Sequence, residues 1–232
     1  LQVLKKPDKP PTSKSYMWLF IGGPPDKRNY IYHYQPSRSH SVPYEFFNEF
    51  NGYLHCDGYQ GYDALAQKRD IKLIACMAHV RRKFFEASKA SKKTGLAKTA
   101  LAKIKQLYLI EASIKEKSLL PDESKKLRAD KSAPLLDDFH QWLEEKATKV
   151  PPKSLIGKAI FYTLGQWDKL IRYLDDGRLD IDNNLTERGI KPFVIGRKNW
   201  LFANSIRGAN AAACIYSLIE TCKAAGIEPF DY

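Results

Sequence analysis

The stretch "GYLHCDGYQGYDALAQKRDIKLIAC", residues 52–76, predicts two short strands separated by a short helix. The strands are "YLHC" and "IKLIAC", and the helix lies in "YDALAQKRD". Asp57 follows the first of these strands directly. A charge at the end of a buried strand costs free energy unless another group binds it. We therefore expect Asp57 to have a binding partner.

The segments on either side extend this pattern of strands followed by helices. "LQVL" opens the chain like part of a strand, and "YMWLFIGG" and "NYIYHYQPS" predict two strands that form a hairpin. A helix is expected in "VPYEFFNEF". Beyond Cys76 we expect helices over residues 78–90, 95–120, 122–147, 154–177, 183–192 and 208–226. Pro192 is expected to stop the helix over residues 183–192, and Gly226 to cap the last helix. Strands first and helices later indicate an α/β or α+β protein.

The composition is that of a folded protein. The 232 residues are 44% hydrophobic and 12% aromatic, enough for one domain with an insertion or for two small domains. No run reaches the roughly 18 apolar residues of a membrane span, and no signal-peptide pattern opens the chain. The four cysteines show no paired spacing, which favours a reducing cytoplasm; they are Cys56, Cys76, Cys214 and Cys222.

Positive charge is concentrated in the middle of the chain. The formal net charge is +12, and residues 81–131 hold 15 Lys or Arg against 6 Asp or Glu. Such a concentration favours a polyanion as partner. A solvated surface of lysine-rich helices is the alternative, and the sequence leaves both open.

Two carboxylates stand out as candidate metal ligands. Asp57 at a strand end suits Mg²⁺, which takes oxygen ligands, although an Asp before a Gly is also common in turns. Glu187 lies in "LDIDNNLTERGIKPFVIGRKNWLF", residues 179–202, among basic and aromatic side chains that fit a nucleic-acid backbone and exposed bases. These neighbours are Arg188, Lys191, Arg197, Lys198, Trp200 and Phe202. The alternative for Glu187 is an ion pair with Lys191 on an exposed helix.

Three other carboxylates compete with these two. Asp180 and Asp182 precede Glu187 closely, but Asp182 is expected to cap the helix that begins near Asn183. Asp63 is expected to cap the helix that follows Tyr62. We therefore rank all three below Asp57 and Glu187.

Cys76 and His79 form a Cys-x-x-His pair, followed by Arg81, Arg82 and Lys83. Such a pair could supply two zinc ligands, but no second pair lies at a usable spacing, so no zinc is expected. We expect Cys76 to be a buried strand residue and His79 to organise or protonate a group near the acidic site.

Several blocks of the chain resemble the insertion-sequence-66 family of transposases. They are "LHCDGYQGY", "CMAHVRRKFFEA", "DNNLTERGIKPFVIGRKNWLF" and "AAACIYSLIETCKAAGIEPFDY", and the opening "LQVLKKPDKPPTSKSYMWLF" is similar too. The blocks keep the family's order and spacing over essentially the whole chain.

The resemblance implies a DDE transposase with a ribonuclease-H-like α/β fold and a long helical insertion before the last catalytic Glu. The expected division is residues 1–86 for the first part of the catalytic domain, 87–176 for the basic insertion and 177–232 for the last part. Asp57 would be the second catalytic carboxylate and Glu187 the third, and Cys76 and His79 match the Cys-x-x-His element between them.

By the same resemblance, three carboxylates would hold two Mg²⁺ ions, or Mn²⁺, about 3.5–4 Å apart for cleavage and strand transfer at the ends of a mobile DNA element. Double-stranded DNA would be the partner of Arg81, Arg82, Lys83, Arg188, Lys191, Arg197, Lys198 and Trp200. A homo-oligomer, accessory proteins of the same element and a nucleoid-associated cytoplasmic location are also expected, and no membrane.

The family's first catalytic Asp lies in an Asp-Glu-Thr stretch that would precede Leu1. We therefore expect residues 1–232 to bind metal weakly and to lack efficient strand transfer. Two alternatives stay open: a non-catalytic DNA-binding or regulatory fragment, and a ribonuclease-H-like nuclease that only hydrolyses.

Overall fold

The computed structural model describes residues 1–7, 9–24, 27–58, 60–68, 70–90 and 95–231. The chain forms two compact units. Unit 1 comprises Leu1–Phe46 and Asn184–Tyr232, and unit 2 comprises Phe47–Asn183. Unit 1 is therefore built from both ends of the chain, and unit 2 from the segment between them.

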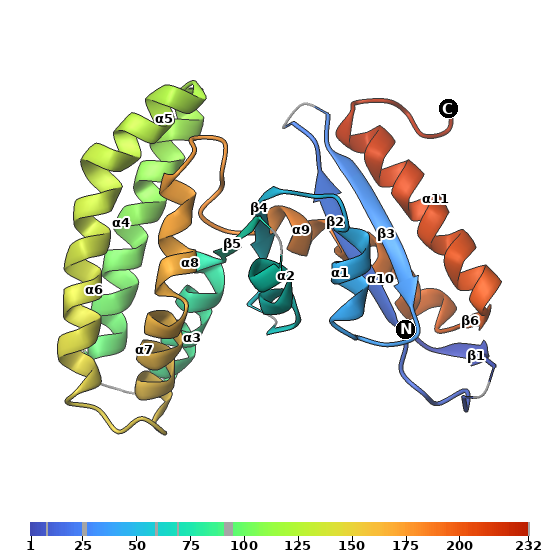
Figure 1. Ribbon diagram of the computed structural model, residues 1–232, viewed down its shortest axis with the longest axis horizontal. Helices are drawn as coiled ribbons and strands as arrows, with labels where there is room; N and C mark the ends of the chain where they lie inside the picture. Colours follow the sequence, from blue (N-terminus) through green and yellow to red (C-terminus); the bar gives the residue numbers. More distant parts are fainter. Residues whose placement is uncertain (8, 25–26, 59, 69, 91–94, 232) are drawn as a thin grey trace. The chain divides into compact units, whose positions relative to one another are not determined.

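Unit 1 is an α/β arrangement around a hairpin (Figure 1). Strands β2 (Tyr16–Gly22) and β3 (Asn29–Gln35) pair antiparallel in full register, as the sequence predicts. β1 (Val3–Lys5) pairs in parallel with β6 (Ala203–Ser205). The helices of this unit are α1 (Ser41–Phe46), α9 (Asn184–Gly189), α10 (Lys191–Trp200) and α11 (Ile206–Ala224).

The two faces of the hairpin bury different side chains because residues alternate along a strand. On one face Phe20 stacks on Phe46 of α1, with ring centroids 3.9 Å apart. On the other face Tyr32 packs with Phe193 of α10 and Ala213 of α11. Figure 1 shows the long helix α11 lying along β3, where the hydroxyl of Ser217 accepts a hydrogen bond from the Tyr32 amide at 2.9 Å.

Unit 2 begins with a strand–helix–strand motif. β4 (Gly52–Cys56) and β5 (Ile71–Ala75) pair in parallel, and α2 (Asp63–Lys68) lies between them in sequence. The register sets Cys56 opposite Ala75, so both strands end at the same edge. Every side chain of β5 except Lys72 is buried, which explains its almost continuous apolar sequence.

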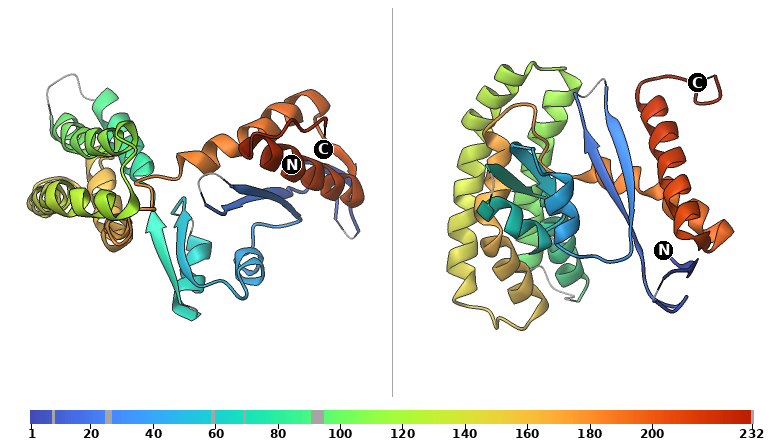
Figure 2. Two further views of the ribbon diagram at one scale, coloured as in Figure 1. Left: turned by 90° about the horizontal axis from the view of Figure 1, so that it is seen from above. Right: turned by 45° about the vertical axis from the view of Figure 1, so that its right-hand side comes forward.

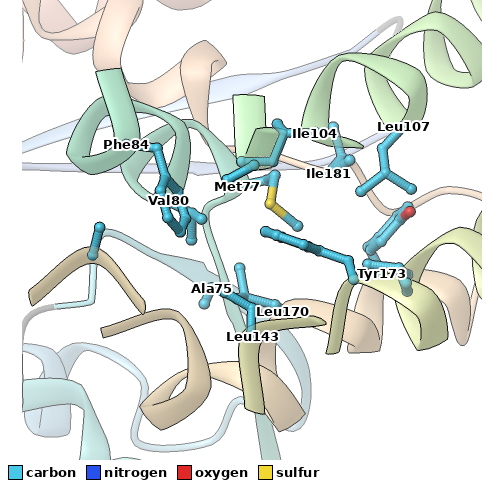
Figure 3. Close-up of a cluster of buried hydrophobic side chains, with 14 of the residues drawn as sticks. Ala75, Met77, Val80, Phe84, Ile104, Leu107, Leu143, Leu170, Tyr173 and Ile181 are labelled. Atoms are coloured by element: carbon cyan, nitrogen blue, oxygen red, sulfur yellow. The ribbon is translucent and has the colours of Figure 1, made fainter. Parts of the chain in front are cut away.

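The rest of unit 2 is helical. α4 (Leu96–Glu116) and α6 (Ala133–Ala147) run side by side, as Figures 1 and 2 show. The other helices are α3 (Met77–Lys89), α5 (Pro121–Leu127), α7 (Leu155–Gly165) and α8 (Trp167–Ile171), with a π-helical turn at Arg128–Ser132 and a 3₁₀ turn at Arg172–Leu174. The apolar faces of α3, α4, α6, α7 and α8 meet β5 in one core, drawn in Figure 3, that includes Met77, Phe84, Ile104, Leu143 and Ile181.

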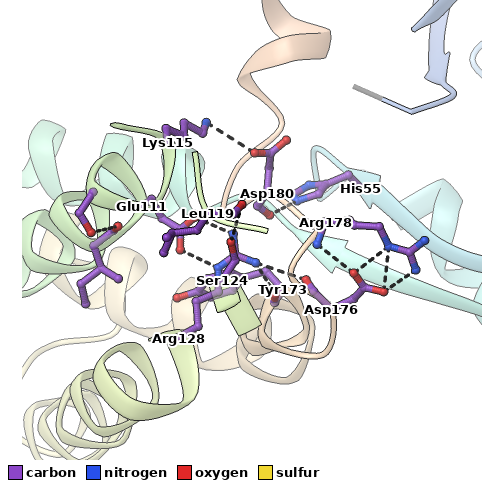
Figure 4. Close-up of polar contacts among 12 residues, drawn as sticks. His55, Glu111, Lys115, Leu119, Ser124, Arg128, Tyr173, Asp176, Arg178 and Asp180 are labelled. Carbon is purple, nitrogen blue, oxygen red and sulfur yellow. Dashed lines mark hydrogen bonds and ion pairs between the residues drawn. The ribbon is translucent and has the colours of Figure 1, made fainter. Parts of the chain in front are cut away.

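A buried ion pair crosses this helical region. The guanidinium of Arg128, in the π-helical turn, donates to both carboxylate oxygens of Glu111 on α4, at 2.9 and 2.7 Å (Figure 4). It also donates to the backbone carbonyls of Tyr173 and Asp176, at 3.2 and 3.3 Å. One cation therefore joins three separate segments of unit 2.

The sequence predicted most of these elements in order, but it missed α10 and β6, and it misread Pro192. Pro192 does not end the helical segment that carries Glu187, because α10 begins at Lys191 and Pro192 lies in its first turn. Proline is tolerated there since the first backbone N–H groups of a helix have no partner within the helix. The strands and helices that were predicted lie where they were expected, within a few residues at their ends, although the helix expected over residues 154–177 is divided into α7, α8 and a 3₁₀ turn. Arg69, at the end of the predicted α2 segment, lies outside the described residues.

The chain is thus a mixed α/β protein with small sheets and extensive helical structure. Segment 87–176, predicted to be an insertion, lies wholly within unit 2, and the three-part division itself stays a prediction. Within the described part of the chain, no helix is long and apolar enough to cross a membrane.

Candidate active site

Asp57 lies at the carboxyl end of the parallel strands β4 and β5. It follows β4 directly and is exposed, and Cys76 follows β5 at the same edge. Ligands of open α/β sheets bind at this edge, because the loops and helix starts that follow the strands gather there. The predicted place of Asp57 directly after a strand is confirmed, and this place suits a ligand-binding role, which stays a prediction.

Gly58, the next residue, is required by its surroundings. Its φ angle is +78°, which favours glycine, and a Cβ atom there would stand 2.9 Å from the hydroxyl oxygen of Tyr162 on α7. The ammonium of Lys83 lies 4.4 Å from the centroid of the Tyr162 ring. The helical region thus contributes an aromatic ring and a cation beside the Asp57 turn.

Cys76 is buried, as predicted, and stands at the start of α3. Its sulfur accepts a hydrogen bond from the Asn183 amide at 3.4 Å, and burial raises the pKa of the thiol. Burial also raises the pKa of the Cys56 thiol to about 11. Both cysteines therefore carry protonated thiols near neutral pH, which fits packing roles. His79 lies in the first turn of α3, three residues after Cys76.

The segment Asp180–Asn183 is fastened to this same edge. The Asp180 carbonyl lies 2.7 Å from Nε2 of His55 on β4 (Figure 4), and the Ile181 carbonyl accepts from the Met77 amide at 3.1 Å. Asn183 N donates to Cys76, and the Asp182 carboxylate accepts from the hydroxyl of Tyr108 on α4 at 2.8 Å. We call residues 180–183, with these contacts, the tether.

The competing carboxylates have structural partners in the described chain. Asp182 does not directly precede the helix it was expected to cap, because α9 begins at Asn184 and Asn183 stands before it. Asp63 is the first residue of α2, and its carboxylate pairs with Lys169 at 2.6 Å. The Asp180 carboxylate lies 3.6 Å from the ammonium of Lys115.

Glu187 lies on α9 in unit 1, immediately after the tether. Gly189 allows α9 to pack closely against the hairpin. A Cβ atom at this position would stand 2.8 Å from the ring of Tyr30 and 3.0 Å from Leu19. The hydroxyl of Tyr32 donates a hydrogen bond to the Gly189 carbonyl. The hairpin thereby fixes the helix that carries Glu187.

The predicted DNA-contacting residues fall into two groups. Arg81, Arg82 and Lys83 lie on α3 in unit 2, and the others lie on α9 and α10 in unit 1: Arg188, Lys191, Arg197, Lys198 and Trp200. Most of these cations are exposed, but Lys83 and Arg197 are half-buried. Trp200 is also half-buried and packs edge-on against Phe193, with ring centroids 5.6 Å apart. Since Asp57 and Glu187 belong to different units, their convergence stays a prediction.

Sequence reasoning missed the residues that build the tether. His55 and Tyr108 occupy ordinary positions on a strand and on an apolar helix face, so neither pattern reveals a polar partner far along the chain. Asn183 was seen only as a helix start. The available signal was a group of polar residues shortly before Glu187, namely Asp180, Asp182, Asn183 and Asn184.

The fold and this edge define a mixed α/β protein with a carboxylate at the end of a parallel strand pair. Comparison with known protein families matches residues 1–211 to the Transposase IS66 family. The chain therefore belongs to the Transposase IS66 family.

The similar curated proteins are longer than this chain. Uncharacterized protein y4qI of Sinorhizobium fredii (strain NBRC 101917 / NGR234) is 32% identical over 236 residues, which cover 95% of this chain and 43% of the relative. Uncharacterized protein y4hP of the same strain is 32% identical over 214 residues, covering 86% of this chain and 38% of the relative. The chain thus spans about two fifths of the length of these relatives. No solved structure gives a significant match.

Proposed function

We propose that the chain is the catalytic region of a DDE-type transposase with a ribonuclease-H-like core. In this proposal the whole protein carries out metal-dependent phosphoryl transfer, both strand cleavage and strand transfer, at the ends of a mobile DNA element, and this chain supplies part of its site. Asp57 and Glu187 are two of the metal ligands. Membership of the transposase family supports the reaction class, and the tether supports the pairing of these two carboxylates.

The tether is the observation that carries the proposal. Asn183 is held at Cys76, and Cys76 and Asp57 follow neighbouring strands at one edge. Glu187 comes four residues after Asn183, so even an extended chain allows their Cα atoms to separate by about 14 Å at most. The covalent chain thus limits how far Glu187 can lie from the edge that bears Asp57.

The donor chemistry fits Mg²⁺ or Mn²⁺. Mg²⁺ is usually bound by one or two carboxylates together with waters and substrate phosphates, and Asp57 is an exposed carboxylate at a strand end. In the part of the chain that the structure describes, no three His, Cys, Asp or Glu side chains form a metal cluster. Two such ions would supply activation of the attacking hydroxyl and stabilisation of the leaving oxygen.

The chain's own cations would bind and orient the DNA. Arg188, Lys191, Arg197 and Lys198 would neutralise phosphates near the scissile bond, and Arg81, Arg82 and Lys83 would do so beside Asp57. The basic helical region of unit 2 would bind flanking double-stranded DNA. Joining two DNA ends would require at least two copies of the chain in one complex, with other proteins of the element as further partners.

Iron-directed cleavage of the polypeptide tests the metal site without requiring catalysis. Fe²⁺ bound in place of Mg²⁺ generates hydroxyl radicals with ascorbate and peroxide, which cut the backbone near the bound ion. We expect cuts near residues 57 and 187 that excess Mg²⁺ suppresses. Asp57→Asn and Glu187→Gln should each abolish both cuts, because one site produces them.

Asp63→Asn is the matched control, since its carboxylate lies close in sequence to Asp57 but pairs with Lys169. It should leave the cuts unchanged. Cuts elsewhere, or cuts at residue 57 that persist in Glu187→Gln, would show that the two carboxylates do not share a metal site.

DNA products distinguish the remaining alternatives. Joined products on element-end DNA with Mg²⁺ or Mn²⁺ support a transposase, and nicks alone support a hydrolytic nuclease. Salt-dependent DNA binding that Asp57→Ala leaves unchanged, with neither nicks nor joints, indicates a DNA-binding fragment.

A further inference from the structure

One side chain connects the long helix α4 to the tether by a short hydrogen bond. Tyr108 lies 74 residues before Asp182, and its hydroxyl donates to the Asp182 carboxylate at 2.8 Å. Burial raises the pKa of the Tyr108 hydroxyl, and the neighbouring Asp182 charge raises it further. The hydroxyl therefore remains a donor throughout the physiological pH range.

A second contact lies on the same face of α4. Lys115 follows Tyr108 by seven residues, which is about two helical turns, and its ammonium lies 3.6 Å from the Asp180 carboxylate. Both partners of this ion pair are well exposed, and exposed pairs contribute little. The half-buried Tyr108–Asp182 hydrogen bond is therefore the stronger link between α4 and the tether.

Asp182 is a carboxylate five residues before Glu187, so it invites a second interpretation as a metal ligand. Its described contact argues otherwise, because one of its oxygens is occupied by a phenol that belongs to the helical region. An acceptor that only receives a hydrogen bond can be replaced by an amide, whereas a ligand of Mg²⁺ or Mn²⁺ cannot be replaced so without a large loss of affinity.

We propose that Tyr108 is a positioning residue that acts through Asp182. By holding Asp182, it anchors the residues that precede α9 in the chain, and so affects how well Glu187 and Asp57 bind one divalent cation. The helical region would thus tune the metal site through a neutral hydroxyl. This inference rests on the proposed metal site.

Binding of Mn²⁺ alone, followed by the EPR signal of free Mn²⁺, tests the inference without DNA or turnover. Tyr108→Phe should weaken Mn²⁺ binding about three- to tenfold, which is the range for losing one typical intramolecular hydrogen bond. Asp182→Ala should weaken it by a similar factor. Asp182→Asn should bind Mn²⁺ as the parent chain does, because its amide oxygen still accepts from Tyr108. The double variant Tyr108→Phe/Asp182→Ala should be no weaker than Asp182→Ala.

Tyr53→Phe is the matched control. It removes another tyrosine hydroxyl that donates to an aspartate in unit 2, here the exposed bond to Asp175 at 3.0 Å, which lies outside residues 180–183. This variant should lower Mn²⁺ affinity by less than a factor of two, which excludes a general effect of losing such a bond. Thermal unfolding of each variant confirms that binding is measured on folded protein. If Tyr108→Phe does not fold, the Mn²⁺ affinities of Asp182→Ala and Asp182→Asn are compared instead, because both variants keep Tyr108. Weaker binding in Asp182→Ala alone supports the positioning role, and equal binding in the two variants overturns it.

The outcomes separate this inference from the proposed function. Unchanged binding in Tyr108→Phe, with weakened binding in Asp57→Asn and Glu187→Gln, overturns the positioning role and leaves the metal site intact. A large loss of Mn²⁺ affinity in Asp182→Asn would show that Asp182 is a metal ligand. This result would also overturn the positioning role of Tyr108. Unchanged binding in Asp57→Asn and Glu187→Gln overturns both proposals.

Discussion

Gly58 and Tyr162 meet closely although they come from opposite parts of unit 2. The Tyr162 hydroxyl oxygen lies 2.9 Å from the point where a Cβ atom on residue 58 would stand. The turn that follows Asp57 is thus shaped by a side chain of α7. The shape of the Asp57 turn therefore depends on the helical region as well as on β4.

Replacing this glycine should be costly. Gly58→Ala puts a side chain on a backbone with φ of +78°, and such strain typically costs about 1–3 kcal/mol of unfolding free energy. Tyr162→Phe in the same chain removes the approaching oxygen but not the backbone strain, so it should restore only part of the loss. Urea unfolding of the single and double variants measures the cost of the backbone strain and the cost of the contact with Tyr162. A Gly58→Ala chain as stable as the parent would contradict this account.

Breaking the Glu111–Arg128 pair should destabilise unit 2 strongly. Glu111→Ala leaves the buried Arg128 guanidinium without its carboxylate, which costs about 3–5 kcal/mol for buried pairs. Glu111→Gln should cost less, because its amide oxygen accepts one of the two hydrogen bonds. Chemical unfolding provides the measurement, and Lys149→Ala, which breaks the exposed Glu145–Lys149 pair, should leave the midpoint nearly unchanged. Equal midpoints for Glu111→Ala and Lys149→Ala would refute the importance of burial.

Stability should fall in mild acid because of His55. Burial lowers the pKa of this imidazole below its usual 6.5, and Nδ1 is buried without a hydrogen-bond partner in the described structure. Below about pH 6.5 the unfolded chain therefore binds a proton that the folded chain does not, so unfolding becomes easier until the lowered pKa is reached. His55→Gln should flatten the dependence between pH 7 and 5 in urea titrations. An identical slope in this variant would assign the effect to other groups.

Thiol reactivity should follow burial. Cys214 is exposed on α11, whereas Cys56, Cys76 and Cys222 are buried, and burial raises the pKa of the Cys56 and Cys76 thiols. Iodoacetamide at pH 8 should therefore modify Cys214 first in the folded protein, and all four cysteines in urea. Peptide mass spectrometry identifies the sites. Rapid modification of Cys56 in the folded state would show that the β4–β5 edge opens readily.

The local structure was largely predictable from the sequence. Short apolar or aromatic runs predicted β2, β3, β4 and β5, with glycines or prolines beside the first three, and helical periodicity predicted α4. Gly226 marked the end of α11. Pro192 misled the prediction, because proline either stops a helix or begins one, and the pattern alone does not say which.

The site was less predictable because its contacts are tertiary. Tyr108 counts as an apolar-face residue in a helical pattern, and only the folded chain shows its hydroxyl at Asp182. Asp57 was recognised by its place after a strand, and the structure confirms that place. Its pairing with Glu187 depends on how two units meet, which stays a prediction.

The parallel pairing of Val3–Lys5 with Ala203–Ser205 has a consequence for biosynthesis. At about 5–20 residues per second, a ribosome adds the second strand roughly 10–40 seconds after the first. For most of that interval the hairpin lacks α9, α10 and α11, and the whole of unit 2 is synthesised before these three helices. Unit 2 would therefore be completed before unit 1. The hairpin of unit 1 would need protection from premature association until α11 is synthesised.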